Sequence, residues 1–351
     1  MISFYPGPSR VHDEIPSWVK EAHSKGILHM SHRGPEFIKL SKKTISLLKN
    51  RLGIPKQYAV YFAGSATECW EIIAQSLVVK KSIHIYNGAF GGKWYDYTHR
   101  LRPEAQSISF DLQQELSPNE LTFIDGDVIC LTQNETSNGT QVSNTIIASI
   151  KKNHPGHVLA VDATSSMAGV YLDFSAADVW FASVQKCFGL PAGLALMICS
   201  PYALERMKSI GEKEHYNSLS FIHQMMEKWQ TPFTPNVLGI YLLKRALKIM
   251  DKIKRVDQKT NSRQKGWIRF FRNSKNLKLL ISRQEVMSKT VLTVNGSPKL
   301  IKMVKAIARK RGLLLGEGYG ELKEATFRIA NFPSIKKREI QKLMEVLRPY
   351  L

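Results

Sequence analysis

The sequence predicts an α/β fold in two parts: a large domain over residues 1–245, which includes an N-terminal arm, and a smaller α+β domain over residues 246–351. Two observations predict this fold. Apolar runs of about four to six residues, the length of buried strands, recur along the chain and alternate with longer amphipathic segments. A chain of 351 residues is also long enough to bury one large core and a second, smaller one.

Composition limits the class of protein. No run approaches the roughly 18 uninterrupted apolar residues that a membrane span needs. The first residues, MISFYPGPSR, lack the basic-then-apolar pattern of a signal peptide, so we expect a soluble protein of the cytoplasm. The four cysteines show no CxxC spacing, and we therefore expect reduced, structural thiols and no metal site.

The net charge of +21 is concentrated in the last third of the chain. From Ala246 onward, 26 Lys and Arg residues stand against 8 Asp and Glu residues, an excess of 18. Such a segment could bind nucleic acid, attract an anionic substrate, or form a solvated face. The lysines are scattered along amphipathic helices without an aromatic stacking series, which favours the solvated face.

The N-terminal segment YPGPSRV, residues 5–11, is predicted to be an extended arm because its prolines fix φ. Further on, SHRGPEF places His32 and Arg33 side by side before a helix that is expected to begin near Pro35. The planar guanidinium of an arginine can hold phosphate or carboxylate with two hydrogen bonds. On their own, the two residues are better explained as an ordinary helix cap and a surface arginine.

A strand, a small-residue turn and a helix are predicted next. Residues 59–62 form the strand, AGSAT the turn, and an apolar stripe from Trp70 the helix. The free N–H groups at the start of such a helix favour a bound anion. Helix capping by Ser65 or Thr67 explains the same residues.

Two further strands end in candidate ligand-binding residues. Residues 83–86 precede NGAFGGKW, whose glycines leave room for an aromatic ring, Phe90, with Trp94 as the competing candidate and core packing as the alternative for either. The strand at 127–131 precedes QNETSNG, which carries Thr136. A plain Asn-Gly turn explains the end of that motif equally well.

The centre of the chain holds an aspartate and a lysine beside buried strands. Residues 158–161 form a strand that delivers Asp162 at its carboxyl end, where open α/β sheets bind ligands. Lys186 lies in the loop between predicted strands at 179–182 and 194–199. Burial disfavours an ammonium group and lowers its pKa, so this amine can be a nucleophile near neutral pH. The alternatives are a capping aspartate and a surface lysine.

The remaining chain alternates helices and strands. The predicted helices span residues 201–211, 218–229, 237–255, 298–311 and 334–347, and the predicted strands span 290–294 and 325–331.

Seven motifs in one order, PGP, SHRxxEF, GSAT, GxF, NETxxG, VDxxSS and SxQK, resemble those of class V aminotransferases from Tyr5 to Arg328, nearly the whole chain. The resemblance implies the fold type I of the aspartate aminotransferases, with a large mixed-sheet α/β/α domain and a smaller C-terminal domain. It also implies the cofactor pyridoxal 5'-phosphate, small-molecule amino-acid and oxo-acid substrates, and a homodimer with active sites at the interface.

The resemblance also implies residue roles. Lys186 carries the cofactor and acts as general base, and Asp162 keeps the ring nitrogen protonated. The remaining cofactor-binding residues are Ser65, Ala66 and Thr67 at the phosphate, Phe90 on the ring, Thr136 and Gln185 near the ring oxygen, and Gln230 and Thr231 from across the dimer. The substrate-binding residues are His32 and Arg33, from the neighbouring subunit, and Arg328 at the α-carboxylate.

The motifs identify the amino acceptor of the reaction less directly. SHRxxEF resembles the phosphoserine aminotransferases within the family, which implies transamination between phosphoserine and 2-oxoglutarate in serine biosynthesis. Two departures favour an alanine–glyoxylate or serine–pyruvate type of enzyme instead. The loop KCFGLPAG is one residue longer between lysine and proline than the usual KNIGPAG, and Thr67 stands where an arginine is sometimes found. A basic nucleic-acid-binding protein is the alternative from another class.

Overall fold

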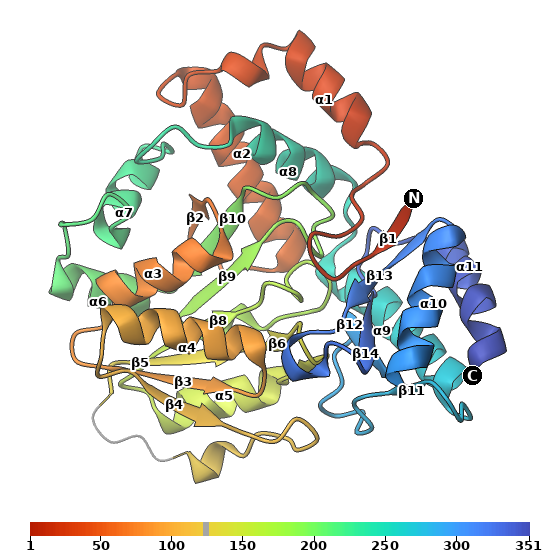
Figure 1. Ribbon diagram of the computed structural model, residues 1–351. Helices are drawn as coiled ribbons and strands as arrows, with labels where there is room; N and C mark the ends of the chain where they lie inside the picture. The colour runs from red at the N-terminus through yellow and green to blue at the C-terminus, as the bar shows by residue number, and fades with distance from the viewer. Residues whose placement is uncertain (122–125) are drawn as a thin grey trace.

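A seven-stranded mixed sheet lies at the centre of the larger part of the computed structural model, which describes residues 1–121 and 126–351 (Figure 1). From edge to edge its strands are β2 (Ala59–Ala63), β10 (Ala195–Cys199), β9 (Val179–Ser183), β8 (Val158–Asp162), β5 (Val128–Thr132), β3 (Ser82–Tyr86) and β4 (Gln106–Ser109). β10 runs antiparallel to both β2 and β9, and the other neighbours pair parallel. The expected mixed sheet is therefore present.

The central strands are apolar throughout because both of their faces are covered. β5, β8, β9 and β10 are buried along their whole length. Parallel strands covered by helices on both sides have this near-continuous apolar composition. Burial of their Val, Ile, Leu and Phe side chains stabilises the fold by roughly 1.5–3 kcal/mol for each side chain.

Helices flank the large sheet. The two that frame the site, α3 (Ala66–Ser76) and α4 (Ala89–Leu101), pack against each other and lie in front of the sheet in Figure 1. The others are α1 (Ile15–Ser24), α2 (Pro35–Leu52), α5 (Asn144–Asn153), α6 (Pro201–Ile210), α7 (Leu219–Glu227) and α8 (Val237–Ile249). No helix among the described residues has the length and apolar character needed to cross a membrane.

A second sheet of five strands joins the two ends of the chain. Its order is β1 (Ile2–Phe4), β13 (Leu313–Glu317), β14 (Thr326–Ala330), β12 (Val291–Asn295) and β11 (Lys278–Leu279). Beside it lie α9 (Ile253–Phe271), α10 (Pro298–Lys310) and α11 (Lys337–Leu347), on the blue side of Figure 1. β1 pairs parallel with β13, so the N-terminal strand belongs to the same sheet as the C-terminal strands. The domain division at residue 245 stays a prediction.

The single helix predicted over residues 237–255 is wrong. α8 ends at Ile249, Met250 has an extended backbone, and a new helix, α9, begins at Ile253. No proline or glycine marks this break. Tertiary packing explains it, because α8 packs on α1 and α2 while α9 packs beside β11, and each helix gains most of its stability from its own apolar face.

Candidate active site

A cavity of about 670 Å³ lies at the carboxyl ends of the central strands. It is lined by Thr132, Asp162 and Ser183, the last residues of β5, β8 and β9. The N-terminal arm, the start of α3, the start of α4 and the segment 317–323 of the smaller sheet complete its wall. This is the edge at which open α/β sheets bind ligands.

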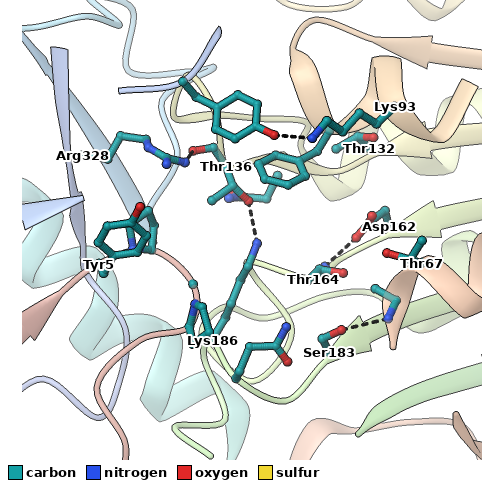
Figure 2. A pocket seen from close by; sticks show the side chains of 18 of the residues that line it. Tyr5, Thr67, Lys93, Thr132, Thr136, Asp162, Thr164, Ser183, Lys186 and Arg328 are labelled. Atoms are coloured by element: carbon teal, nitrogen blue, oxygen red, sulfur yellow. Dashed lines mark hydrogen bonds between the residues drawn. The ribbon is translucent and has the colours of Figure 1, made fainter. Parts of the chain in front are cut away.

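Lys186 is buried at this cavity, with 7% of its surface exposed. Its Nζ donates a hydrogen bond of 2.8 Å to Thr136 Oγ1, and Figure 2 shows the side chain rising from the loop toward that hydroxyl. Burial lowers the pKa of the amine to about 8, while the nearby carboxylates of Asp162 and Glu135 oppose the shift. The surface-lysine interpretation is wrong, and a substantial fraction of this amine is neutral near pH 8.

Asp162 faces the same cavity from the end of β8 (Figure 2). Its Oδ1 accepts a hydrogen bond of 2.8 Å from the backbone N–H of Thr164, and its Oδ2 accepts one of 3.3 Å from Trp70 Nε1. Burial raises the pKa of the carboxyl, while these hydrogen bonds and the charge of Lys186 act against the rise. The two groups that the sequence singles out therefore share one buried site.

The N-terminal arm packs directly on the lysine loop. Ser9 N donates to Gln185 O at 3.0 Å, and His12 N donates to Gly189 O at 3.0 Å. Gly7 has a φ of +143°, and a Cβ built there would lie 2.7 Å from Lys186 Cε. Only a glycine allows this backbone to pass so close to the lysine.

Phe90 and Trp94 occupy different environments. Phe90 is the second residue of α4 rather than the end of a strand, and Lys186 Nζ lies 5.2 Å from its ring centroid. Trp94, one turn later, is buried in the core, stacked on Trp70 with ring centroids 6.3 Å apart. Phe90 lines the cavity and Trp94 does not.

A buried carboxylate fixes the start of α4. Glu135 Oε2 accepts hydrogen bonds of 3.1 Å from the N–H groups of Phe90 and Gly91, and its Oε1 accepts from the N–H and hydroxyl of Ser137. A negative group at a helix N-terminus is favourable for the helix dipole. Glu135 thereby holds the ring of Phe90 over the cavity.

The start of α3 supplies the predicted small-residue turn. Ser65 Oγ accepts from Glu68 N at 3.0 Å, so the interpretation of Ser65 as the helix cap is confirmed. Ala66 N donates to Ser183 Oγ at 2.9 Å. Ser65, Ala66 and Thr67 all line the cavity, and their role toward a cofactor phosphate stays a prediction.

Arg328 reaches the cavity from β14 and is 4% exposed. Its Nε donates to Glu317 O at 2.6 Å and its Nη1 donates to Thr136 O at 2.8 Å. These two carbonyls orient the guanidinium, whose remaining N–H groups are available to a bound carboxylate.

The family model of aminotransferase class-V matches residues 6–318. The chain belongs to the class V aminotransferases. The resemblance of the motifs, the type I fold and the dependence on pyridoxal 5'-phosphate are confirmed with it.

Individual relatives of this class V aminotransferase are named phosphoserine aminotransferase. One from Corynebacterium glutamicum (strain R) is 27% identical over 350 residues, which cover 96% of this chain and 91% of the relative. A solved structure of the enzyme from Cytophaga hutchinsonii has a TM-score of 0.95 and 31% identity, and covers 100% of this chain and 99% of its own. An alanine–glyoxylate aminotransferase from Nostoc sp. has a TM-score of 0.84 at 19% identity, covers 99% and 94% of the two chains, and shows the fold alone.

The chemistry of the cavity fits the cofactor of this aminotransferase family. Three buried side-chain atoms at the cavity, Thr132 Oγ1, Thr164 Oγ1 and Gln185 Oε1, have no hydrogen-bond partner within the described part of the chain. Buried polar atoms normally have partners. A polar heterocycle that brings its own donors and acceptors suits this lining, as do the buried amine and carboxylate.

Four predicted residues of this aminotransferase lie away from the cavity of their own chain. Among the described residues, His32, Arg33, Gln230 and Thr231 do not line it. Arg33 Nη1 donates to Gln230 Oε1 at 3.1 Å, and Gln230 Nε2 donates to Arg33 O at 3.3 Å. Two segments 197 residues apart therefore meet at the exposed Arg33.

Several residues at the cavity of this aminotransferase were missed by sequence reasoning. They are Tyr5, Trp70, Lys93, Thr132, Asn134, Thr164, Tyr319 and Lys323. Thr132 directly follows a predicted strand, and Asn134 and Thr164 each lie three residues after one, which is a signal that could have found them. Trp70, Lys93 and Tyr319 carry no such signal.

Proposed function

We propose that this chain is a phosphoserine aminotransferase, which transfers an amino group between phosphoserine and 2-oxoglutarate and so serves serine biosynthesis. The observation that carries the proposal is that the buried side chains of Lys186, Asp162 and Arg328 line one and the same cavity. The names of the relatives from C. glutamicum and C. hutchinsonii support the choice of substrate. A cytoplasmic location stays a prediction.

When bound, pyridoxal 5'-phosphate supplies an electron sink for negative charge at the substrate's α-carbon. Lys186 holds the cofactor, and its Nζ then takes the α-proton from the substrate and returns it. The lowered pKa of this amine, about 8, suits a base that works near neutral pH. Asp162, fixed by Thr164 and Trp70, holds a proton at the ring nitrogen.

The rest of the predicted set surrounds these two groups. In this proposal Ser65, Ala66 and Thr67 bind the cofactor phosphate with the N-terminus of α3, where backbone N–H groups favour an anion. Phe90 covers one face of the ring. Thr136 and Gln185 hydrogen-bond near the ring oxygen, and the contact of Thr136 with Lys186 keeps the base oriented.

Arg328 binds the substrate's α-carboxylate in this proposal. A guanidinium has five N–H donors, and two of them are engaged by the carbonyls of Glu317 and Thr136. The remaining donors can form a bidentate pair with a carboxylate, which is stronger and more directional than a single hydrogen bond.

A homodimer completes the site in this proposal. Arg33 and His32, together with Gln230 and Thr231, reach the cavity of a second copy of the chain, where Arg33 binds the acidic group of the substrate. The exposure of Arg33 and its pairing with Gln230 support this arrangement, because two residues expected to act across the dimer contact each other away from the cavity of their own chain.

The substrate is tested by half-reactions. The cofactor-loaded protein is mixed separately with phosphoserine, serine and alanine, and the absorbance of the lysine-bound cofactor is followed. We expect the fastest conversion with phosphoserine. Faster conversion with alanine or serine would favour the alanine–glyoxylate or serine–pyruvate type, which the longer lysine loop supports.

A further inference from the structure

Two lysines flank the mouth of the cavity. Lys93 lies on α4, one position before Trp94 and three after Phe90, and Lys323 follows the short 3-10 helix η4 (Gly320–Leu322). Both line the cavity and both are exposed. Lys93 belongs to a helix beside the large sheet, and Lys323 belongs to the segment that follows β13 of the smaller sheet. The mouth therefore lies between α4 and that segment.

A tyrosine fixes the position of Lys93. Lys93 Nζ donates a hydrogen bond to Tyr319 Oη and lies 5.2 Å from the Tyr319 ring centroid and 6.0 Å from that of Phe90. The rings of Phe90 and Tyr319 are 5.1 Å apart. The ammonium group is therefore held over two aromatic rings instead of extending freely into solvent.

Neither lysine has an ion-pair partner among the described residues. Within residues 1–121 and 126–351, no carboxylate lies within 4.0 Å of Lys93 or Lys323. Glu317, which lines the cavity, is paired with Lys305. Glu321 and Glu324 neighbour Lys323 in the sequence, but neither forms an ion pair with it. An ammonium group without an ion-pair partner at the mouth of a pocket attracts anions.

Tyr319 also links this charge to Arg328. The guanidinium carbon of Arg328 lies 5.4 Å from the ring centroid of Tyr319, whose hydroxyl contacts Lys93 at the other end. One tyrosine side chain thus separates Arg328 from Lys93. We expect a substrate whose α-carboxylate is on Arg328 and whose α-carbon is near Lys186 to extend its distal group toward Lys93.

We propose that Lys93 and Lys323 form an anion subsite, within the same chain as Lys186, that binds the distal phosphate or carboxylate of the amino-acid substrate. The inference rests on the proposed function and deepens it. It assigns distal-anion recognition to two lysines at the mouth in addition to the residues proposed to come from a second copy. Tyr319 acts as the positioning residue, because it holds the amine of Lys93.

The test compares variants with three amino acids. Lys93→Met and Lys323→Met remove the charge and keep an unbranched side chain that is shorter by one atom. Lys93→Arg keeps the charge, and Lys302→Met makes the same change at an exposed site on α10. For each protein, the dissociation constant of phosphoserine, glutamate and serine is obtained from the concentration dependence of the half-reaction. Inhibition by inorganic phosphate is measured as a second readout.

We expect the dissociation constants of phosphoserine and glutamate to rise about tenfold in each Lys→Met variant at the mouth, which equals about 1.4 kcal/mol. Serine, which lacks a distal charge, should bind unchanged, and inorganic phosphate should inhibit about tenfold more weakly. Lys93→Arg, which keeps the charge, should recover most of the binding lost in Lys93→Met, and Lys302→Met should behave as the wild type.

The outcomes separate the two proposals. If wild-type protein prefers phosphoserine to serine and both Lys→Met variants keep that preference in full, the subsite is wrong and the proposed function stands. An equal loss of binding for serine would also overturn the subsite, because it would show a general effect on the site. If the wild type itself does not prefer phosphoserine, the proposed function fails.

Discussion

Lys186 Nζ and Thr136 Oγ1 are joined by a hydrogen bond of 2.8 Å, although the two residues are 50 positions apart. The same threonine accepts a hydrogen bond from Arg328 through its backbone carbonyl. Thr136 therefore connects the buried amine to the guanidinium on the smaller sheet. Thr136 lies in the turn between β6 (Asn134–Glu135) and β7 (Thr140–Gln141). A shift of this hairpin would therefore move the Lys186 amine and the Arg328 guanidinium together.

The pKa of Lys186 predicts how cofactor capture depends on pH. Only the neutral amine is nucleophilic, and burial lowers the pKa of this group from 10.5 to about 8. Below pH 8 the neutral fraction, and with it the capture rate, should rise about tenfold for each pH unit, and it should level off above pH 8. Stopped-flow absorbance of the cofactor-free protein mixed with pyridoxal 5'-phosphate measures this rate.

Two controls accompany this measurement. Lys186→Ala should give no absorbance of lysine-bound cofactor at any pH. The free amine of Nα-acetyl-lysine has an ordinary pKa near 10.4, so its rate of reaction with the cofactor should keep rising up to about pH 10. A protein profile that followed the free amino acid would contradict the effect of burial on Lys186.

Asp162→Asn should lower the rate of the half-reaction by about a hundredfold or more, because removal of a preorganised charge at a reacting system has costs of this order. The amide is nearly the same size as the carboxyl group, so folding should be preserved. Single-turnover kinetics measure the rate, and circular dichroism checks the fold. A variant with the wild-type rate would remove Asp162 from the proposed mechanism.

Trp70→Phe tests the support of this carboxylate. The variant loses the N–H that donates to Asp162 Oδ2 at 3.3 Å but keeps an aromatic ring beside Trp94. Because the hydrogen bond is long, we expect a loss in rate of less than about tenfold. A loss as large as that of Asp162→Asn would mean that Trp70 contributes more than this hydrogen bond.

Gly7→Ala should displace the side chain of Lys186. The new Cβ would lie 2.7 Å from Lys186 Cε, at a backbone φ of +143°. We expect a loss of about 1–3 kcal/mol in unfolding free energy from the strain and a weaker hold on the cofactor. Thermal unfolding and titration with pyridoxal 5'-phosphate measure the two effects.

Gly53→Ala is the matched control for this change. Gly53 also has a positive φ, +78°, but a Cβ built there meets nothing within 4 Å. This variant should lose stability through backbone strain alone and should bind the cofactor as the wild type does. Equal cofactor binding in both variants would show that the arm does not constrain Lys186.

Mixing two inactive variants tests the shared site. Lys186→Ala lacks the amine, and Arg33→Ala lacks the arginine proposed to act in the second copy. If the sites are shared, unfolding and refolding an equal mixture should restore about a quarter of the wild-type activity toward phosphoserine, because half of the dimers are mixed and each has one complete site. Activity no higher than the sum of the separate variants would show that Arg33 does not act across a dimer.

The central strands and the lysine, aspartate and threonine at their ends could be predicted, because a buried strand leaves a local apolar signature and its last residue faces the ligand edge. The sequence could not show which of Phe90 and Trp94 lines the cavity. Both are aromatic, and the choice depends on Glu135, a residue 45 positions from Phe90 that anchors the start of α4.

The break between α8 and α9 and the mouth of the cavity could not be predicted either. Met250 ends a helix without any local stop signal, because packing against α1 and α2 rather than its own sequence decides where α8 ends. Lys93 has the pattern of any exposed helix position. Its proposed role in anion binding depends on Tyr319, which lies 226 positions later in the sequence and contacts Lys93 only in the folded chain.

The pairing of β1 with β13 affects how the chain folds while it is being synthesised on the ribosome. β1 leaves the ribosome long before β13 is made, so the arm must wait without its partner strand while the whole large sheet assembles. The segment beside Lys186 is then anchored by one of the last steps of folding. A nascent or truncated chain that lacks β13 would carry its reactive amine in a site with an open wall.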